Sequence, residues 1–390
     1  MTPSTSTMNA RANADAISTR IREWLSASSL SDAGAVLALL RRNRIAALCA
    51  ACPGMAPADS LWASTMPRLS AAYQASLVHG LRALQAAMPL TAAFEARGIP
   101  WLAMRGPFWA LQLHDDPGAR EFADIDLFVH PSRRWEALAL ARAAGWRLEH
   151  AVPPAGYFAR YHLHWRLVHS NHDIPCELHW AFDHPSGAPT IDVDAVFGRT
   201  QIVQSSDWSW RTPAPVDHLL LAVAHLYKHL NHIPPPADGV AILSSGTGRY
   251  WIDVACLASA LTSPGEWEAA LSQAKAWHLL PGWSYASSGM TLFWPLIGMP
   301  AMDRVPFAPP DAVSCPAPAP WFRRMAHVGG FSAERWYDLC GAQSFRRRGV
   351  LGRCAVAARF FAMGAELVCY ATWRAFTRTT DIRPRTGAVT

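Results

Sequence analysis

The sequence predicts an α+β fold in which a small mixed sheet lies between helical segments. Three observations lead to this prediction. Before residue 96, apolar residues recur at helical spacing, at Leu77, Leu81, Leu84 and Met88. Two later stretches, 122–129 and 162–180, alternate apolar and polar residues, as strands do. From Pro213 the spacing of apolar residues becomes helical again.

The order of these patterns divides the 390 residues into four expected parts. They are a helical N-terminal segment at 1–96, an α/β core at 97–205, a helical domain that closes the cleft at 206–303, and a basic helical C-terminal segment at 304–390. Hydrophobic residues make up 51% of the chain, which is enough for a sizeable core. The composition therefore excludes intrinsic disorder as a general description.

The core is expected to begin with a short strand that is broken by a glycine turn. This strand lies within Gly98 to Met104, and the turn is Arg105-Gly106. Pro107 suits the first turn of the helix that should follow. Backbone N–H groups at such a turn and helix N-terminus are suited to an anion. We therefore predict that Arg105 and Gly106 hold phosphate groups.

The next stretch, 122–129, is the most informative part of the chain. In a strand, Asp124 and Asp126 point to the same face, while the apolar residues between and after them face the other way. Two negative charges so close together are unfavourable unless something neutralises them, and a divalent cation that prefers oxygen is the usual remedy. The pair predicts a Mg²⁺ or Mn²⁺ site, although a solvated strand end with two acids would give the same pattern.

A hairpin is expected after a helix at Ser132–Ala144. Its two alternating runs, 162–169 and 174–180, are separated by the turn residues Ser-Asn-His-Asp. On the second run Glu177 and His179 share a face, so Glu177 could join the two aspartates as a third carboxylate. His179 could orient Glu177 or contact a phosphate.

Two helices are expected farther along, at Pro215–Asn231 and at Tyr250–Leu261. The first carries Lys228, which the residues alone indicate to be an exposed cation on an apolar helix. The second carries Asp253 within an apolar run.

These blocks together resemble a known family. The runs R-G-P, R-E-F-A-D-I-D-L-F-V and C-E-L-H-W, followed by HLLLAVAHLYKHLNH and RYWIDVACLAS, are similar to the uncharacterised nucleotidyltransferase family, a bacterial branch of the DNA polymerase beta-like superfamily. The resemblance covers roughly residues 80 to 300. It implies a polymerase beta-like core in which Asp124, Asp126 and Glu177 hold the metal ions and serve as the catalytic acids.

The resemblance also implies which residues neutralise the phosphates of a nucleoside triphosphate, namely Arg105, Arg120 and Lys228. The sequence departs from the superfamily pattern at one point, because the usual Gly-Ser pair is absent and Arg105-Gly106-Pro107 stands there instead. An arginine keeps the charge of the family's lysine but grips two oxygens with a planar fork. Pro107 removes one backbone N–H from the turn.

We therefore expect a metal-dependent nucleotidyltransferase. It would move a nucleoside monophosphate, with AMP from ATP as the first expectation, to a small-molecule, peptide or protein acceptor and release pyrophosphate. Two alternatives stay open. An RNA-directed or toxin-like transferase is favoured by the basic C-terminal segment, and a non-catalytic nucleotide-binding scaffold is favoured by the absence of the Gly-Ser pair.

Charge and location give weaker indications. From Arg304 to Thr390 there are 13 Lys and Arg against 5 Asp and Glu, so this segment suits an anionic partner such as nucleic acid, or is simply a solvated rim. The uncharged stretch Leu279–Met302 is interrupted by proline and glycine, so no transmembrane segment is expected. With no apparent secretory signal and eight scattered cysteines, a cytoplasmic location is the default expectation.

Overall fold

The computed structural model describes residues 15–25, 32–52, 60–149, 155–182, 190–205, 208–230, 236–290 and 292. The chain forms two compact units. The first consists of Met1–Arg147, Arg166–Phe182 and Pro189–Cys315, and the second takes Leu148–Trp165, Asp183–Ala188 and Pro316–Thr390. The basic C-terminal segment predicted at 304–390 lies outside the described residues.

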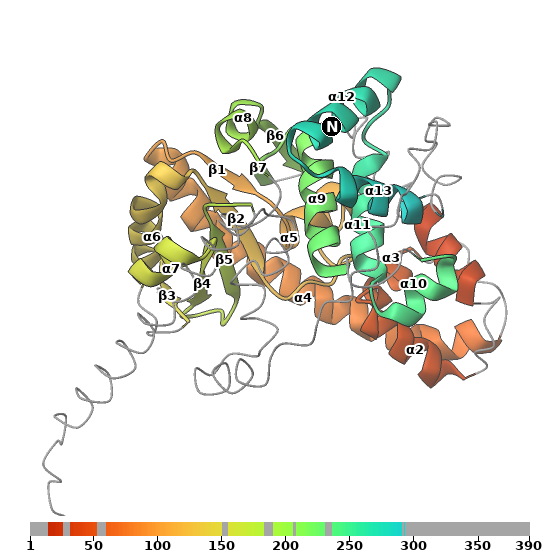
Figure 1. Ribbon diagram of the computed structural model, residues 1–390. Helices are drawn as coiled ribbons and strands as arrows, with labels where there is room; N and C mark the ends of the chain where they lie inside the picture. Colours follow the sequence, from red (N-terminus) through yellow and green to blue (C-terminus); the bar gives the residue numbers. More distant parts are fainter. Residues whose placement is uncertain are drawn as a thin grey trace, which may run out of the picture. The chain divides into compact units, whose positions relative to one another are not determined.

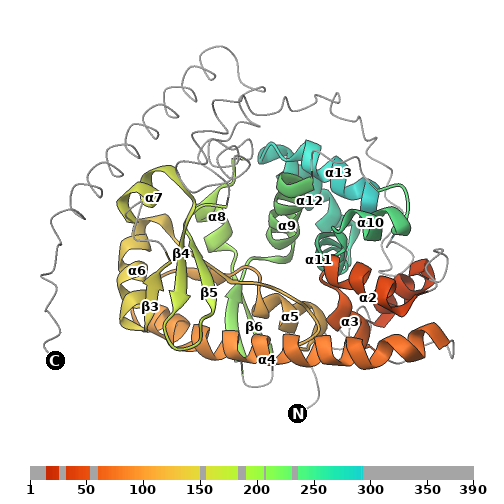
Figure 2. The same ribbon diagram turned by 90° about the horizontal axis from the view of Figure 1, so that it is seen from below.

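Helices make up the described N-terminal part of the first unit. After a helical stretch at 15–25 come α2 (Ala33–Arg42), α3 (Ala46–Ala51) and α4 (Ser60–Ala96). Asp32 caps α2, because its side chain accepts a hydrogen bond from the backbone N–H of Ala35. The long helix α4 packs against α2 and α3 and continues past the sheet to α5 (Pro107–His114) and α6 (Arg134–Ala143) (Figure 2).

A five-stranded sheet follows, with the strand order β1-β2-β5-β4-β3. Its strands are β1 (Trp101–Ala103), β2 (Ile125–Val129), β3 (Trp146–Leu148), β4 (His164–His169) and β5 (Pro175–His179). Strand β2 pairs antiparallel with β1 and parallel with β5, so the sheet is mixed. This arrangement and the helices around it confirm the predicted α+β class (Figure 1).

Two local features connect the strands. Between β2 and β3 the chain forms the short 3₁₀ helix η1 (Pro131–Arg133) and then α6, close to the helix predicted at Ser132–Ala144. Between β4 and β5 lies the predicted turn, in which Asp173 adopts a positive φ of 52° and the N–H of His169 donates to the carbonyl of Ile174. The second unit contributes one described helix, α7 (Ala155–Tyr161).

The remainder of the first unit is mainly helical. It comprises α8 (Val193–Gly198), the antiparallel pair β6 (Gln201–Ser205) and β7 (Trp208–Thr212), α9 (Pro215–Leu230), α10 (Gly239–Ser245), α11 (Gly248–Ala258), α12 (Pro264–Ala276) and α13 (Leu280–Met290). Helix α9 packs against α11, α12 and α13 (Figure 1). One cluster of buried apolar side chains extends from the N-terminal helices through β1 and α5 to α9 and α11. Among the described residues, no helix combines the length and the apolar character that a membrane span requires.

Candidate functional site

The glycine turn between β1 and α5 lies directly against the start of β2. Gly106 has φ 67° and ψ −134° and stands immediately before α5. A Cβ atom at this position would lie 2.6 Å from the carbonyl oxygen of Asp124 and 3.2 Å from the Cα of Ile125. Both the positive φ and the close approach require glycine. The turn predicted to hold phosphate is therefore placed beside the predicted acids by backbone packing.

The three predicted acids come together at the β2–β5 pairing. Asp126 is buried on β2 and lies in register with Glu177 on the parallel strand β5. Asp124 stands just before β2 and is half-buried. Burial, and then the nearby carboxylates of Asp126 and Glu177, raise the pKa of Asp124 to about 6. The carboxylates are therefore close enough to influence one another's charge.

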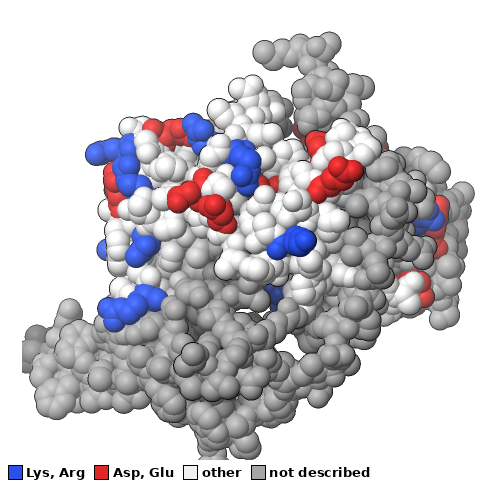
Figure 3. All heavy atoms as spheres, turned by 45° about the horizontal axis from the view of Figure 1, so that its top comes forward, with Lys and Arg blue, Asp and Glu red and all other residues white. Residues whose placement is uncertain are grey.

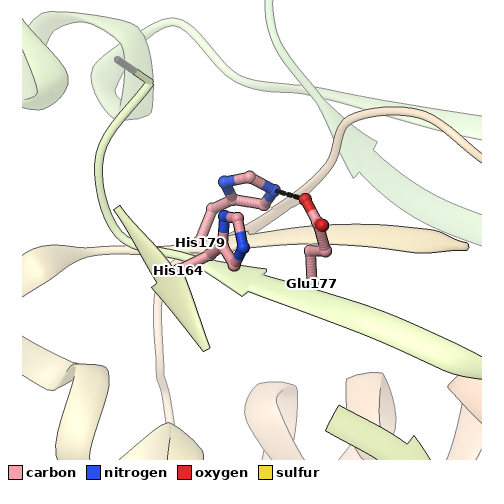
Figure 4. Close-up of side chains that lie close together, drawn as sticks. All are labelled: His164, Glu177 and His179. Atoms are coloured by element: carbon pink, nitrogen blue, oxygen red, sulfur yellow. Dashed lines mark ion pairs between the residues drawn. The ribbon is translucent and has the colours of Figure 1, made fainter. Parts of the chain in front are cut away.

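Two cations partly compensate this negative charge. Oδ1 of Asp126 accepts hydrogen bonds from Nη2 of Arg105 at 2.8 Å and from Nε2 of His179 at 3.0 Å. The same His179 nitrogen lies 3.3 Å from Oε2 of Glu177, and Figure 4 shows the two side chains pointing toward each other from β5. His164, also labelled there, begins β4 and belongs to the second compact unit.

The pKa values of these groups follow from their contacts. Burial alone would raise the pKa of Asp126, but Arg105 and His179 hold it below its ordinary value. Burial alone would lower the pKa of His179, but its hydrogen bonds to Asp126 and Glu177 raise it. The histidine therefore holds its proton more tightly than a free imidazole does and joins the two predicted metal ligands, which is consistent with its expected role of orienting Glu177.

Arg105 extends from the turn to the helical side of the site. Its Nη1 contacts Nε2 of His225 on α9 at 2.7 Å. Burial and then the positive charge of Arg105 hold the pKa of His225 well below its ordinary value, so this imidazole is neutral and can accept a hydrogen bond from the guanidinium. Nε of Arg105 is buried and makes no hydrogen bond within the described part of the chain.

Lys228 lies on α9 three residues after His225, and residues at this spacing share a helix face. It is half-buried, and its charge contributes to the lowered pKa of His225. Within the described ranges, no hydrogen bond or ion pair engages its ammonium group. The predicted phosphate ligand is therefore on the same side of the site as Arg105.

The residues before the acids fix this part of the chain to three helices. Arg120 is buried and donates two hydrogen bonds of 2.8 Å to Asp253 of α11. The carboxylate of Glu121 accepts a 2.9 Å hydrogen bond from the N–H of Ala47 at the start of α3. The ring of Phe122 lies 4.8 Å from that of His79 on α4. These contacts explain the sequence R-E-F that precedes Asp124: each side chain anchors the loop that carries the acids.

The sequence did not indicate the partner of Arg105 or of Arg120. One signal for Asp253 was present, because an aspartate inside an apolar helix is buried and needs a partner. For His225 the signal was its spacing from His229, which identified a shared helix face but not the arginine opposite. Both pairings join residues more than 100 positions apart.

The donor set suits a hard divalent cation. Three carboxylates at one edge of two paired strands supply the oxygen ligands that Mg²⁺ and Mn²⁺ prefer. In addition, a buried guanidinium nitrogen without a hydrogen-bond partner in the described ranges stands beside them on Arg105. Phosphate oxygens, which carry the complementary charge, match such a donor. These groups have the chemistry that a divalent metal ion and a phosphorylated ligand require of their partners.

Comparison with known proteins agrees with this chemistry. No curated protein matches the chain significantly. A family model described as an uncharacterised nucleotidyltransferase matches residues 29–288, which are two thirds of the chain and include every predicted site residue. This match confirms the resemblance, and the chain belongs to the uncharacterised nucleotidyltransferase family.

Proposed function

We propose that this protein transfers a nucleoside monophosphate from a nucleoside triphosphate to an acceptor and releases pyrophosphate. Membership of the family supports a general role in nucleotidyl transfer. The observation that carries the proposal is the convergence of Asp124, Asp126 and Glu177 beside the Arg105-Gly106 turn. AMP from ATP is the first transfer to test, and a small molecule, a peptide or a protein side chain is the acceptor class that we expect.

Asp124, Asp126 and Glu177 would hold Mg²⁺ or Mn²⁺. When bound, such ions activate an acceptor oxygen and stabilise the negative charge of the departing pyrophosphate. The carboxylate of Glu177 is the group that we assign to take the proton of the acceptor hydroxyl, because it is less buried than Asp126. The rest of the catalysis is positioning for in-line attack on the α-phosphate.

The cations have separate tasks in this proposal. Arg105 and Lys228 contact the triphosphate, and Gly106 lets the backbone turn closely beside it. His179 keeps Glu177 in place through its 3.3 Å contact. The sequence suggested a phosphate contact for Arg120 as well, but its fork is filled by Asp253, so the proposal gives Arg120 no phosphate.

The test is to supply each of the four α-³²P-labelled nucleoside triphosphates with Mg²⁺ or Mn²⁺ and to fractionate the products of a cell extract. We expect label to move to a non-nucleic-acid fraction with wild type but not with Asp124→Ala. Asp194→Asn, which changes an acid that is 87% exposed and pairs with His130, is the matched control and should retain transfer. Undiminished transfer by Asp124→Ala would remove the acid cluster from the mechanism.

One observation favours the non-catalytic alternative. Arg105 and His179 already neutralise Asp126, as they would in a protein that uses this fold only to bind nucleotide. A scaffold of this kind would bind ATP without Mg²⁺ as tightly as with it. Calorimetry with and without the metal distinguishes the two functions, because the transferase requires metal for tight binding.

The RNA-directed alternative depends on the C-terminal segment, which lies outside the described residues. On the face that Figure 3 shows, acidic and basic side chains of the described part are interspersed and form no single-sign surface. RNA binding through the tail would weaken steeply as salt rises, because bound counterions are released. Transfer to RNA that is lost in a variant with Arg346, Arg347 and Arg348 changed to Ala would favour this alternative.

A further inference from the structure

Arg120 links the sheet side of the candidate site to its helical side. Its Nε and Nη2 atoms each donate a 2.8 Å hydrogen bond to the carboxylate of Asp253 on α11, and Nη1 donates to the carbonyl oxygen of Gly106 at 3.3 Å. The two ion-paired side chains are only 5% and 6% exposed. All three nitrogens of the guanidinium therefore bond to other groups of the protein, and one of them bonds to the turn that carries Arg105.

A third contact extends this connection. The guanidinium of Arg120 lies over the indole of Trp109 in α5, with 5.2 Å between Cζ and the ring centroid. The indole N–H of Trp109 donates to His218 on α9. Arg120 therefore contacts the glycine turn, α5 and α11 directly and α9 through one intermediate. Helix α9 also carries His225, the partner of Arg105.

Stability alone is a poor explanation for a buried ion pair of this kind. Both charges lose their hydration on folding, and an apolar pair of similar volume often leaves a protein equally stable. A bidentate pair contributes geometry instead, because the planar fork fixes the distance and the angle between the two elements that it joins. Here the fork joins the loop before β2 to α11, the helix next to α9, and the remaining Nη1 bonds to Gly106 in the turn that backs onto Asp124.

We infer that Arg120 and Asp253 are positioning residues that hold the glycine turn against α11. The inference rests on the proposed nucleotidyl transfer. The pair aligns Arg105 with the acids on one side and with the helical groups on the other. Its effect on the reaction passes through Gly106 and Arg105, and neither member touches the substrate.

A double variant, Arg120→Met with Asp253→Leu, tests this role because it removes both charges and leaves neither partner unpaired. We expect a cooperative thermal transition near that of wild type, Mn²⁺ affinity about tenfold weaker, and kcat lower by about 100-fold, which is the effect of a displacement of roughly 1 Å. Wild-type kcat and Mn²⁺ affinity would overturn the inference. So would a rise in KM for ATP at unchanged kcat, since that result would make Arg120 a phosphate ligand.

Arg120→Lys covers the case in which the double variant does not fold. It keeps the charge but cannot form both bonds to Asp253, so kcat should fall while KM for ATP stays near wild type; an unchanged kcat contradicts the positioning role. The control is Arg199→Met with Asp217→Leu, which removes another bidentate pair, at 2.9 and 2.8 Å, between Arg199 at the end of α8 and Asp217 in the first turn of α9. This control should leave Mn²⁺ affinity unchanged.

The Mn²⁺ titration separates the inference from the proposed function. If wild type binds Mn²⁺ at the acids but transfers no label from any nucleotide, the proposed function fails. The loss of Mn²⁺ affinity in the Arg120–Asp253 variant, with the Arg199–Asp217 variant unaffected, still decides whether the pair holds the glycine turn in place beside the acids.

Discussion

The two sides of the candidate site are held in place by different means. On the sheet side, Asp126 and Glu177 are register partners on adjacent parallel strands, so backbone hydrogen bonds fix their separation. On the helical side, His225 and Asp253 meet the turn only through side chains, those of Arg105 and Arg120. This difference teaches that the acids depend on the sheet, whereas the alignment of the cations depends on a few polar contacts that single substitutions can break.

The largest expected effect is on the sheet side. Asp126→Asn should lower the proposed nucleotidyl transfer by about three orders of magnitude, because it removes a charge that the proposed metal site requires. It should also destabilise the fold by about 3 kcal/mol, since it leaves Arg105 and His179 buried with a weakened partner. Transfer assays and urea unfolding check the two parts.

Glu177→Gln is the companion experiment, because Glu177 is the register partner of Asp126. It should abolish transfer to a similar degree with a smaller effect on stability, because Glu177 is more exposed and its histidine contact is longer. Wild-type turnover and Mn²⁺ affinity in this variant would exclude Glu177 from the metal site.

The second prediction concerns Arg105, whose guanidinium contacts both sides of the site. Arg105→Ala should weaken ATP binding by about 30-fold to 100-fold, on the scale of a lost charge-assisted hydrogen bond. Arg105→Lys should recover only part of this affinity, because an ammonium cannot contact Asp126 and His225 at the same time as a fork does. Calorimetry with ATP measures both variants, and unchanged affinity in Arg105→Ala would place the phosphates elsewhere.

The contrast between the two sides also explains what could be predicted from the sequence. The acids were predictable because strand alternation is a local pattern, and the turn residues between β4 and β5 identify the strand that carries Glu177. The expected bounds of α9 were within one residue of those observed. Alternation and helical spacing are local patterns, so they predict a single helix or strand and the element next to it in the chain.

The helical side was less predictable for a physical reason. The Arg120–Asp253 pair joins residues 133 positions apart, and no local spacing determines such a contact. The resemblance implied a phosphate role for Arg120, whereas its fork binds the carboxylate of Asp253. The β6–β7 pair was also not predicted, since short strands with mixed exposure give a weak alternation signal.

The third prediction uses the opposite pKa shifts of the two aspartates. The folded pKa of Asp124 is about 6, above its ordinary value of 3.8, so the folded state holds this proton more tightly than the unfolded state does. Stability is therefore lost as the pH rises from about 4 to about 6. Asp124→Asn should remove this loss and, without metal, stabilise the protein by about 1–2 kcal/mol above pH 6.

The measurement is urea unfolding of wild type and Asp124→Asn at pH 4 and at pH 7.5, both in a chelator. At pH 4 the two proteins should differ little, because Asp124 is then largely protonated in the folded state. Adding Mn²⁺ at pH 7.5 should stabilise wild type and not the variant. If wild type and Asp124→Asn had the same stability at pH 4 and the same stability at pH 7.5, the other acids would not be raising the pKa of Asp124.

The smallest expected effect concerns Lys228, which lies on α9 three residues after His225. Lys228→Ala should raise KM for ATP by about threefold to tenfold and leave kcat nearly unchanged, because a half-solvated ammonium near a phosphate contributes about 1 kcal/mol. Higher salt should reduce the difference between variant and wild type, since screening weakens an exposed charge more than a buried one. Lys275→Ala, an exposed lysine on α12, is the matched control and should change neither constant. Equal KM values for the two lysine variants would leave Arg105 as the only described side chain assigned to the phosphates, and the sheet side would then bind the nucleotide without help from α9.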